Sequence, residues 1–386
     1  MADRHATYAW LRDNRPVAPI ALPGGDRAWL ITRYDDVRAG LSDPQLSNDQ
    51  NRLALPTPFD VLPAHIRSAV ITDVQNVDPP QHSRLRGLLA PLFSPSQAAA
   101  RRPRLQSLAD ELIDSLADRN TVDLVADFAM PFAAGSLAEI LGIPLAESAH
   151  FQRIANAVVS AIHGGAPDDL AAAALEQHAY VADLIARTAS APESGLVSDL
   201  VRAHQDGELS AEEMSSTIFG LLIAGQEGTA NLIASGMHLL LTHPEQLAKL
   251  RKDAGLITSA VDEFARYSTP LDLPIFRSCP RDVEFSGGTV PANEPIMFSL
   301  ASSGRDGARF DRPDDVDITR VDTQHLAFGR GVHFCPGARF GRVQAEVAIG
   351  TLVARCAEGM ALEPDGVEWQ RSTVTRALRS LSVHLS

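Results

Sequence analysis

The chain has few cysteines and few aromatic residues, and its acidic side chains outnumber its basic ones. Three cysteines in 386 residues cannot build a disulfide framework, which suits a reducing cytoplasm. The formal net charge of −14 argues against nucleic acid or an anionic membrane surface as a partner. The segment Met1–Val17 lacks an apolar run, so we expect neither a signal peptide nor a membrane anchor.

The sequence also lacks the marks of a domain boundary. It has no Gly/Ser-rich linker, no block of like charges and no internal repeat, and a hydrophobic content of 45% is enough for a large core. We therefore expect one domain that spans residues 1–386. Hydrophobic periodicity predicts a mainly α structure with a minor β region near the two ends. The expected strands are Val17–Leu22 and Ala28–Thr32, joined by a turn at Gly24 and Gly25, then Ile275–Ser278, Val283–Phe285 and Pro295–Phe298, and a pair at the C-terminus.

Two of the expected helices bear on function. The segment Ser215–Leu241 is apolar nearly all round, so a helix there must be buried. Polar residues in its middle, among them Gln226 and Asn231, favour a core helix over a membrane span. A second helix is expected to begin at Asp78, which is an N-cap acid followed by two prolines, and to run to about Phe93.

Cys335 lies in a glycine-rich segment, ahead of a helix that we expect to open with Pro336. Free N–H groups and the positive end of the helix dipole favour a thiolate over a thiol at such a place. The ordinary interpretation of a lone Cys-Pro-Gly is a buried, inert cysteine. A zinc site is a weaker alternative, because Cys279 and Cys356 lack the close spacing of zinc ligands.

The longer pattern F-x-x-G-x-x-x-C-x-G decides between these interpretations. It is formed by Phe328, Gly331, Cys335 and Gly337, and it resembles the haem-ligand loop of the cytochrome P-450 family. The resemblance implies that Cys335 is the axial thiolate ligand of the iron in haem b, and that Phe328 and Gly337 also bind the cofactor. It implies the cytochrome P-450 fold, a triangular helical prism enclosing haem. Segments that carry the likeness cover about two-thirds of the chain.

The resemblance also assigns cationic partners to the two haem propionates. His82 and Arg86 stand four residues apart and share one face of the expected helix. Alone, such a pair is usually a solvated surface feature. Together with the cysteine loop, it resembles the family's propionate-binding helix, and Arg277 and His333 match the remaining contacts.

Glu263 and Arg266 match the family's E-x-x-R helix. On a surface, an acid and a base at this spacing contribute only a few tenths of a kcal/mol. The resemblance gives the pair a structural role, in which it locks the scaffold beneath the haem and takes no part in catalysis. A third partner is expected from the stretch after Phe310, where Arg312 and Arg320 are both candidates.

The buried helix contains a segment that resembles the family's oxygen-binding segment, with Ala224 and Gly225 against the haem. Glu227 holds the position of the acid that guides protons to dioxygen, so we expect it to be catalytic. Gly228 stands where the family normally has an alcohol. Thr229 comes one residue later, about 100° further round the helix, and we expect its hydroxyl to bond back to its own helix. Gly228 then provides room or a backbone distortion, and proton delivery depends on water or on a hydroxyl of the substrate.

The function implied is a haem-thiolate monooxygenase that uses dioxygen to hydroxylate or epoxidise a medium-sized, largely apolar natural product. One alternative is that the same enzyme couples substrate radicals through a C–C or C–O bond without oxygen insertion, because Gly228 replaces the alcohol. Another is a non-catalytic haem sensor, against which the retained Glu227 argues. The substrate is open among macrolides, other polyketides, terpenoids and cyclic dipeptides.

Electrons are expected from a separate ferredoxin and its reductase, because no flavin- or nicotinamide-binding segment is apparent in the sequence. We expect a monomeric, cytoplasmic enzyme without nucleic-acid or membrane partners. Basic side chains around the cysteine loop are expected to form a docking patch for an acidic ferredoxin. They are Arg330, Arg339 and Arg342.

The substrate pocket is expected to be mostly apolar. Besides Gly228, its lining is predicted from Leu271, Asp272, Leu273 and Ile275, with Asp272 as one polar contact. By the same resemblance, the rest of the lining comes from the stretch Ser47–Val74, the helices around His150–Leu184 and the turn near Thr373.

Overall fold

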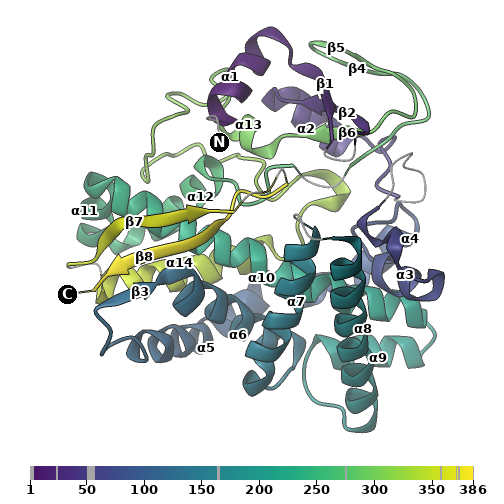
Figure 1. Cartoon of the computed structure of the whole chain (residues 1–386), viewed down its shortest axis with the longest axis horizontal. Coiled ribbons are helices and arrows are strands. Elements are labelled where there is room, and N and C mark those ends of the chain that lie inside the picture. The colour runs from purple at the N-terminus through teal and green to yellow at the C-terminus, as the bar shows by residue number, and fades with distance from the viewer. Residues whose placement is uncertain are drawn as a thin grey trace.

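The computed structural model describes residues 4–22, 25–49, 57–162, 166–273, 276–356, 359–370, 372 and 374–385. Helices make up most of it, as the sequence predicts, and they surround one long central helix (Figure 1). In chain order they are α1 (Arg4–Asn14), α2 (Tyr34–Ser42), α3 (Ala64–Ile71), α4 (Gln81–Leu89), α5 (Pro95–Asp114), α6 (Met130–Leu141), α7 (Ser148–Ile162), α8 (Pro167–Ser190), α9 (Leu196–Gln205), α10 (Ala211–Thr242), α11 (Pro244–Lys252), α12 (Ile257–Tyr267), α13 (Leu300–Gly304) and α14 (Ala338–Arg355).

The strands form small sheets at two edges of the molecule (Figure 1). Strands β1 (Val17–Ala21) and β2 (Arg27–Ile31) form the predicted antiparallel hairpin, and β6 (Ile296–Phe298) pairs with β2 in parallel. Gly24 of the predicted turn lies outside the described residues. The C-terminal strands are paired as predicted and join one strand that the sequence did not indicate. That sheet has the order β3 (Thr121–Asp123), β8 (Leu378–His384), β7 (Ala361–Trp369), and β4 (Val283–Phe285) pairs with β5 (Gly288–Val290).

The predicted strand Ile275–Ser278 is not formed. Arg277 and Ser278 make only isolated bridges, to Ile296 and Ser47 respectively, and Ile275 lies outside the described residues. The two bridges run to different partners, so no continuous ladder can develop. They nevertheless tie the segment after α12 to the chain between α2 and α3, next to the cavity described below.

Helix α10 is the predicted buried helix, and it begins four residues earlier than expected. A capping box explains the early start: the Ser210 hydroxyl accepts the Glu213 N–H at 3.1 Å, and the Glu213 carboxylate accepts the Ser210 N–H at 3.0 Å. The helix packs against α3, α6, α8, α12 and α14. Because it contacts so many helices, its side chains are buried nearly all round.

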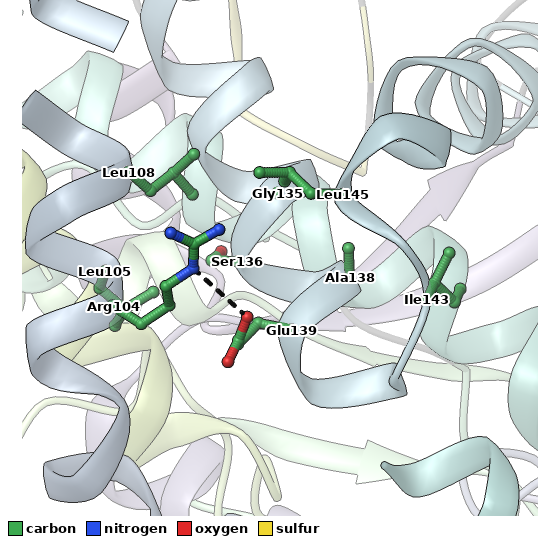
Figure 2. A pocket seen from close by; sticks show the side chains of 9 residues that line it. All are labelled: Arg104, Leu105, Leu108, Gly135, Ser136, Ala138, Glu139, Ile143 and Leu145. Atoms are coloured by element: carbon green, nitrogen blue, oxygen red, sulfur yellow. Dashed lines mark ion pairs between the residues drawn. The ribbon is translucent and has the colours of Figure 1, made fainter. Parts of the chain in front are cut away.

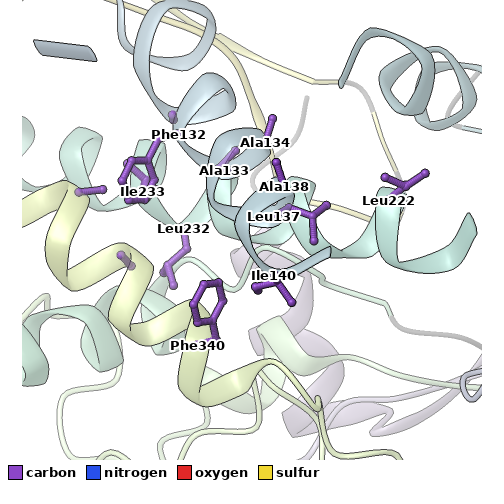
Figure 3. Close-up of a cluster of buried hydrophobic side chains, with 14 of the residues drawn as sticks. Phe132, Ala133, Ala134, Leu137, Ala138, Ile140, Leu222, Leu232, Ile233 and Phe340 are labelled. Atoms are coloured by element: carbon purple, nitrogen blue, oxygen red, sulfur yellow. The ribbon is translucent and has the colours of Figure 1, made fainter. Parts of the chain in front are cut away.

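The main core lies where α6, α10 and α14 meet (Figure 3). Phe132 and Leu137 of α6, Leu232 and Ile233 of α10, and Phe340 of α14 are each at most 5% exposed. Removing one such aromatic or leucine side chain leaves a cavity that costs about 2–5 kcal/mol. This core fixes α10 relative to the start of α14, which follows the cysteine loop.

Helix α4 begins differently from the prediction. Asp78 does not cap it, because the Asp78 carboxylate instead accepts the Ser47 hydroxyl and the Asn48 N–H, the latter at 2.9 Å. The helix starts at Gln81, and a separate 3₁₀ turn covers Ala90–Phe93. The Asp78 side chain therefore anchors the loop before α3 beside the start of α4.

Two further features lie away from the cysteine loop. A water-sized cavity of about 30 Å³ between α5 and α6 is lined by Leu108 and Ser136 and crossed by an Arg104–Glu139 ion pair at 3.7 Å (Figure 2).

Among the described residues, one segment, Leu124–Leu141, is long and apolar enough to cross a membrane. Because 72% of it is buried within the fold, it packs as a core helix does.

Candidate active site

A cavity of about 340 Å³ lies between α10 and the loop that carries Cys335. Its walls come from segments far apart in the sequence: the chain before α4, α4 itself, α6, α10, the segment after α12 and the start of α14. Most of the lining is apolar, as a site for an apolar ligand requires. The apolar side chains include Leu41, Val74, Leu89, Phe93, Leu137, Ile140, Leu221, Leu232, Leu271, Leu300, Phe328 and Phe340.

The cysteine loop is held by glycine geometry and by one backbone bond. Gly331 has φ +74°, and a Cβ at this position would lie 2.5 Å from the Leu41 carbonyl oxygen, so only glycine fits. The Cys335 N–H donates to the Phe328 carbonyl at 2.9 Å. The predicted helix start at Pro336 is wrong by two residues, since Pro336 and Gly337 form a turn and α14 begins at Ala338.

The surroundings of the Cys335 thiol act on its pKa in two opposing directions. Burial raises the pKa of Cys335 and is the largest influence on it. The N–H groups of Gly337 and Ala338 and the charges of Arg86 and Arg342 lower the same pKa, but by less. The helix start therefore favours the thiolate in the expected direction, and burial outweighs it. A bound metal cation is what favours the thiolate form of such a buried cysteine.

The four predicted propionate contacts line the same cavity near the thiol. They are His82, Arg86, Arg277 and His333, and the exposed Arg330 also belongs to the lining. The His82 and His333 rings lie 4.4 Å apart, and both ring nitrogens of His82 are buried without a hydrogen-bond partner among the described residues. Burial lowers the pKa of Arg277 to about 10 and that of His333 to about 3.

These four side chains form no ion pair within the described chain, although the charge of Asp78 acts on His82, Arg277 and His333 from a greater distance. No ion pair there includes Arg86 or Arg277, and the guanidinium of Arg277, 4% exposed, reaches only the carbonyl oxygens of Gly40 and Leu41 at 3.4 and 3.2 Å. Buried cations of this kind are stabilised by an anion. Orphaned nitrogens and unpaired guanidiniums beside a thiol fit a flat, dianionic, metal-bearing group such as haem.

One face of α10 opens into the cavity. Ala224 and Gly228 are exposed there although the rest of the helix is mostly buried. A Cβ on Gly228 would meet no atom within 4 Å, so the glycine leaves open space above the thiol. Gly225 also lines the cavity, but a Cβ there would come within 2.7 Å of Leu137, so close packing of α10 on α6 requires it.

Glu227 and Thr229, the neighbours of Gly228 on α10, differ in their surroundings. Glu227 does not line the cavity; its Oε1 is buried without a partner among the described residues, and burial raises its pKa to about 7. Thr229 does line the cavity. The expectation that its hydroxyl bonds back to its own helix is wrong, because it donates to Gln344 Oε1 of α14 at 3.1 Å. The Gln344 amide in turn donates to Ser136 of α6, so a buried polar chain joins three helices.

The Glu263–Arg266 pair is fully buried, with an Nε–Oε2 distance of 2.7 Å. Its third partner is Arg320, whose Nε lies 3.1 Å from Glu263 Oε2. Arg312, the other candidate, faces solvent and pairs with surface aspartates. Arg266 also donates to the carbonyl oxygens of residues 304, 313 and 315, so the pair ties α12 to the chain that leads to the cysteine loop.

The predicted pocket residues divide into two groups. Leu271 lines the cavity together with Gly228. Asp272 does not, so its prediction as a polar contact is wrong. Its carboxylate is fully buried and accepts Arg4 at 2.7 Å, Tyr8 at 2.8 Å and Ser299 at 3.0 Å.

Leu273 also faces away from the cavity. It packs with Tyr8 and neighbouring residues in a separate small core, because α1 covers this segment. Ile275 and Thr373 lie outside the described residues. Of the longer stretches, Ser47–Val74 contributes Asn48, Asp73 and Val74, whereas the described part of 150–184 contributes nothing to the lining.

Some lining residues were not predicted from the sequence. On α10 they are Thr217, Gly220 and Leu221. Together with Ala224 and Gly228 they recur every three or four residues, which places them on one face of a helix. That spacing was a usable signal. Gln75 and Gln344 carried no comparable signal, because only the tertiary fold brings them to the cavity.

The three arginines of the predicted docking patch differ in how exposed they are. Arg330 and Arg339 are exposed. Arg342 is largely engaged inside the protein, with its Nε 2.7 Å from Asp262 and its guanidinium 4.3 Å from the centre of the Phe328 ring. Val332 and Phe334, in the same loop, are 51% and 41% exposed.

Comparison with known proteins agrees with this geometry. The family model of cytochrome P450 matches residues 169–361. A 6-deoxyerythronolide B hydroxylase from Saccharopolyspora erythraea is 34% identical over 99% of this chain and 96% of its own.

Two solved structures extend the likeness over the whole fold. The tirandamycin C-bound P450 monooxygenase TamI has a TM-score of 0.91 and 34% identity, and the match covers 100% of this chain and 98% of that one. The P450 enzyme CxnD, described as forming a C–S bond in chuangxinmycin biosynthesis, has a TM-score of 0.89 and 33% identity, covering 99% of this chain and 94% of that one. The expected fold is thus confirmed, and the chain belongs to the cytochrome P450 family, as a monooxygenase whose cofactor is a haem iron with a cysteine thiolate ligand.

Proposed function

We propose that the protein uses haem b to hydroxylate or epoxidise a medium-sized, largely apolar natural product. The observation that carries the proposal is the cavity that a cysteine thiol, one face of α10 and cationic groups without an ion-pair partner among the described residues line together. A relative named 6-deoxyerythronolide B hydroxylase and a similar structure with tirandamycin C bound support this substrate class.

Different lining residues would contact different parts of the cofactor. Cys335 would supply the axial thiolate, and His82, Arg86, Arg277 and His333 would pair with the propionates. Phe328, Gly337, Ala224 and Gly225 would form the apolar faces that enclose the ring. When bound, haem with a thiolate ligand supplies the electron density that favours cleavage of the O–O bond.

Residues of α10 decide how a proton can reach the cavity. Glu227 can hold a proton near neutral pH because burial raises its pKa to about 7. Gly228 provides no hydroxyl, and the Thr229 hydroxyl is already committed as a donor to Gln344. A proton would therefore pass from Glu227 to the cavity through water or through a hydroxyl of the substrate.

The test of thiolate ligation is the absorption spectrum of the reduced protein with carbon monoxide. Wild type should show the far-red-shifted Soret band of a thiolate-bound haem, and Cys335→Ala should lose it. Cys279→Ala and Cys356→Ala, which change the remaining cysteines of the chain, should keep the band. Loss of the band in either of these controls, with retention in Cys335→Ala, would refute the assignment.

Electrons would come from a ferredoxin and its reductase, with the enzyme acting as a cytoplasmic monomer. The exposed Arg330 and Arg339 flank the exposed apolar side chains of Val332 and Phe334, and such a combination suits an acidic protein partner. Arg339→Glu should slow reduction by ferredoxin, and added salt should reduce the difference from wild type. Equal rates across a salt series would exclude Arg339 from the docking surface.

A second candidate is oxidative coupling of substrate radicals without oxygen insertion. The absence of a hydroxyl at Gly228, with open space in its place, favours it, and the structurally similar CxnD is described as forming a C–S bond. Turnover under ¹⁸O-labelled dioxygen separates the two. Label in the product supports hydroxylation or epoxidation, and an unlabelled, dehydrogenated product supports coupling.

A further inference from the structure

The cavity has a second polar region, distinct from the cationic groups near Cys335. We call it the polar corner and define it by four lining residues: Asn48, Asp73, Gln75 and Thr217. The first three come from the chain before α4, and Thr217 comes from α10. Apolar side chains make up most of the remaining lining, so a largely apolar ligand that fills the cavity meets few other polar groups besides these and the cationic ones.

Among the described residues of the cavity lining, Asp73 is the only one with a carboxylate. It is 4% exposed, and its Oδ1 accepts the Gln75 N–H and the Asn76 amide, both at 2.9 Å. Its Oδ2 faces α10, where a Cβ on Gly220 would come within 2.5 Å of it. Gly220 therefore makes room for the carboxyl group at the cavity wall. Burial raises the pKa of Asp73 to about 7, so this group can act as donor or acceptor near neutral pH.

Asn48 presents an unsatisfied acceptor beside it. Its amide nitrogen donates to the Gln75 carbonyl at 3.2 Å, which fixes the orientation of the amide. The Asn48 Oδ1 is then left buried, with no partner among the described residues, in a side chain that is 4% exposed. A buried carbonyl oxygen of this kind costs about 1–3 kcal/mol when it stays unpaired, so a ligand that donates to it gains affinity.

We infer that the polar corner binds a hydroxyl group of the substrate, which donates to Asn48 Oδ1 and bonds to the Asp73 carboxyl. The inference rests on the proposed function and narrows its substrate class to apolar molecules that already carry an alcohol. A hydroxyl suits the corner better than an ammonium ion, because a neutral group loses less hydration on burial. A ketone or an ether offers no hydrogen to Asn48.

The position of the corner also sets which part of the substrate is oxidised. Thr217 and Gly220 lie seven and four residues before Ala224 on the same helix face. At about 1.5 Å per residue, the anchored hydroxyl lies roughly 6–10 Å from the level of Ala224. The substrate carbon that lies at the level of Ala224 is therefore remote from the alcohol and not its neighbour.

The test compares three probes that share one apolar ring: cyclododecanol, cyclododecanone and cyclododecane. Their dissociation constants are measured on the haem-loaded protein by calorimetry and by the shift of the Soret band. Wild type should bind the alcohol about five- to tenfold more tightly than the ketone, as one hydrogen bond to a buried acceptor allows. A wild-type enzyme without this preference overturns the inference.

Two variants and one control make the test specific. Asp73→Asn keeps the size of the side chain but places an amide donor toward the cavity, so the alcohol-to-ketone preference should fall at least fivefold; Asn48→Leu should reduce it as well. Asp35→Asn, the same change at an exposed acid of α2, should leave it unaltered. A preference that stays within twofold of wild type in both cavity variants overturns the inference. Loss of the carbon monoxide band in wild type would instead refute the proposed function, while the calorimetric ratios still test the corner.

Discussion

Replacing Arg266 by methionine should destabilise the protein more than any change of a surface arginine. The side chain donates five hydrogen bonds: two to Glu263, at 2.7 and 2.8 Å, and three to the carbonyl oxygens of residues 304, 313 and 315. Both partners of the ion pair have no exposed side-chain surface. In Arg266→Met, the Glu263 carboxylate keeps only Arg320 and the Asp317 N–H.

The expected loss is about 3–5 kcal/mol, which is the usual effect of removing one partner of a buried ion pair. With a urea slope of about 3 kcal/mol per M, the unfolding midpoint should fall by roughly 1–1.7 M. Arg320→Met removes one bond to Glu263 and three bonds to backbone carbonyls at a partly exposed site, and it should have a smaller effect.

The matched control is Arg312→Met. Arg312 is 63% exposed and pairs with Asp311, Asp315 and Asp317 at 3.4–3.8 Å, and surface pairs of this kind contribute about 0–1 kcal/mol. Urea unfolding of the holoenzyme, followed by far-ultraviolet circular dichroism, compares the variants. If Arg266→Met and Arg312→Met shift the midpoint equally, the buried pair does not hold the scaffold together.

The remaining predictions concern three residues of α10. Gly228→Thr should weaken substrate binding about tenfold without loss of folding, because the new side chain enters open space in the cavity; higher coupling of reducing equivalents to product at unchanged affinity would contradict this. Glu227→Gln should slow turnover and leave substrate-induced spectral shifts unchanged. Because the pKa of Glu227 is raised, the folded state holds a proton that the unfolded state releases between about pH 4.5 and 7. The free energy of unfolding of the wild type should therefore fall as the pH rises through this range. Glu227→Gln, which does not titrate, should be more stable than wild type by roughly 1–3 kcal/mol between pH 5 and 8, as measured by urea unfolding. Thr229→Val should lose about 1–3 kcal/mol, since it leaves Gln344 Oε1 unpaired, whereas Thr229→Ser should keep most of the stability.

The features that the sequence predicts well are those written in contiguous residues. The cysteine loop combines glycine geometry and a thiol within ten residues, so its local form follows from the motif. The long apolar run of α10 likewise predicts a buried helix without knowledge of its partners. The same holds for the β1–β2 hairpin, whose two strands are neighbours in the chain.

The features that the sequence did not predict depend on partners far away. Asp272 stands in an apolar segment and was expected to meet the substrate, but Arg4 and Tyr8, more than 260 residues earlier, occupy its carboxylate. Thr229 was expected to bond within its own helix, but Gln344 competes for its hydroxyl. No local pattern records either contact. Each depends on how α1 and α14 are placed by packing elsewhere.

The contacts of Arg266 also imply an order of events as the chain is synthesised. Every group that Arg266 contacts outside its own helix, and Arg320 as well, is made after α12. His82 and Arg86 leave the ribosome early, whereas Cys335 follows only when most of the 386 residues have been joined. The side chains of His82 and Arg86, the cavity face of α10 and the Cys335 thiol therefore cannot meet until synthesis is nearly complete. Cofactor capture belongs to the end of folding, and a chain truncated before residue 320 should have neither a closed scaffold nor a place for haem.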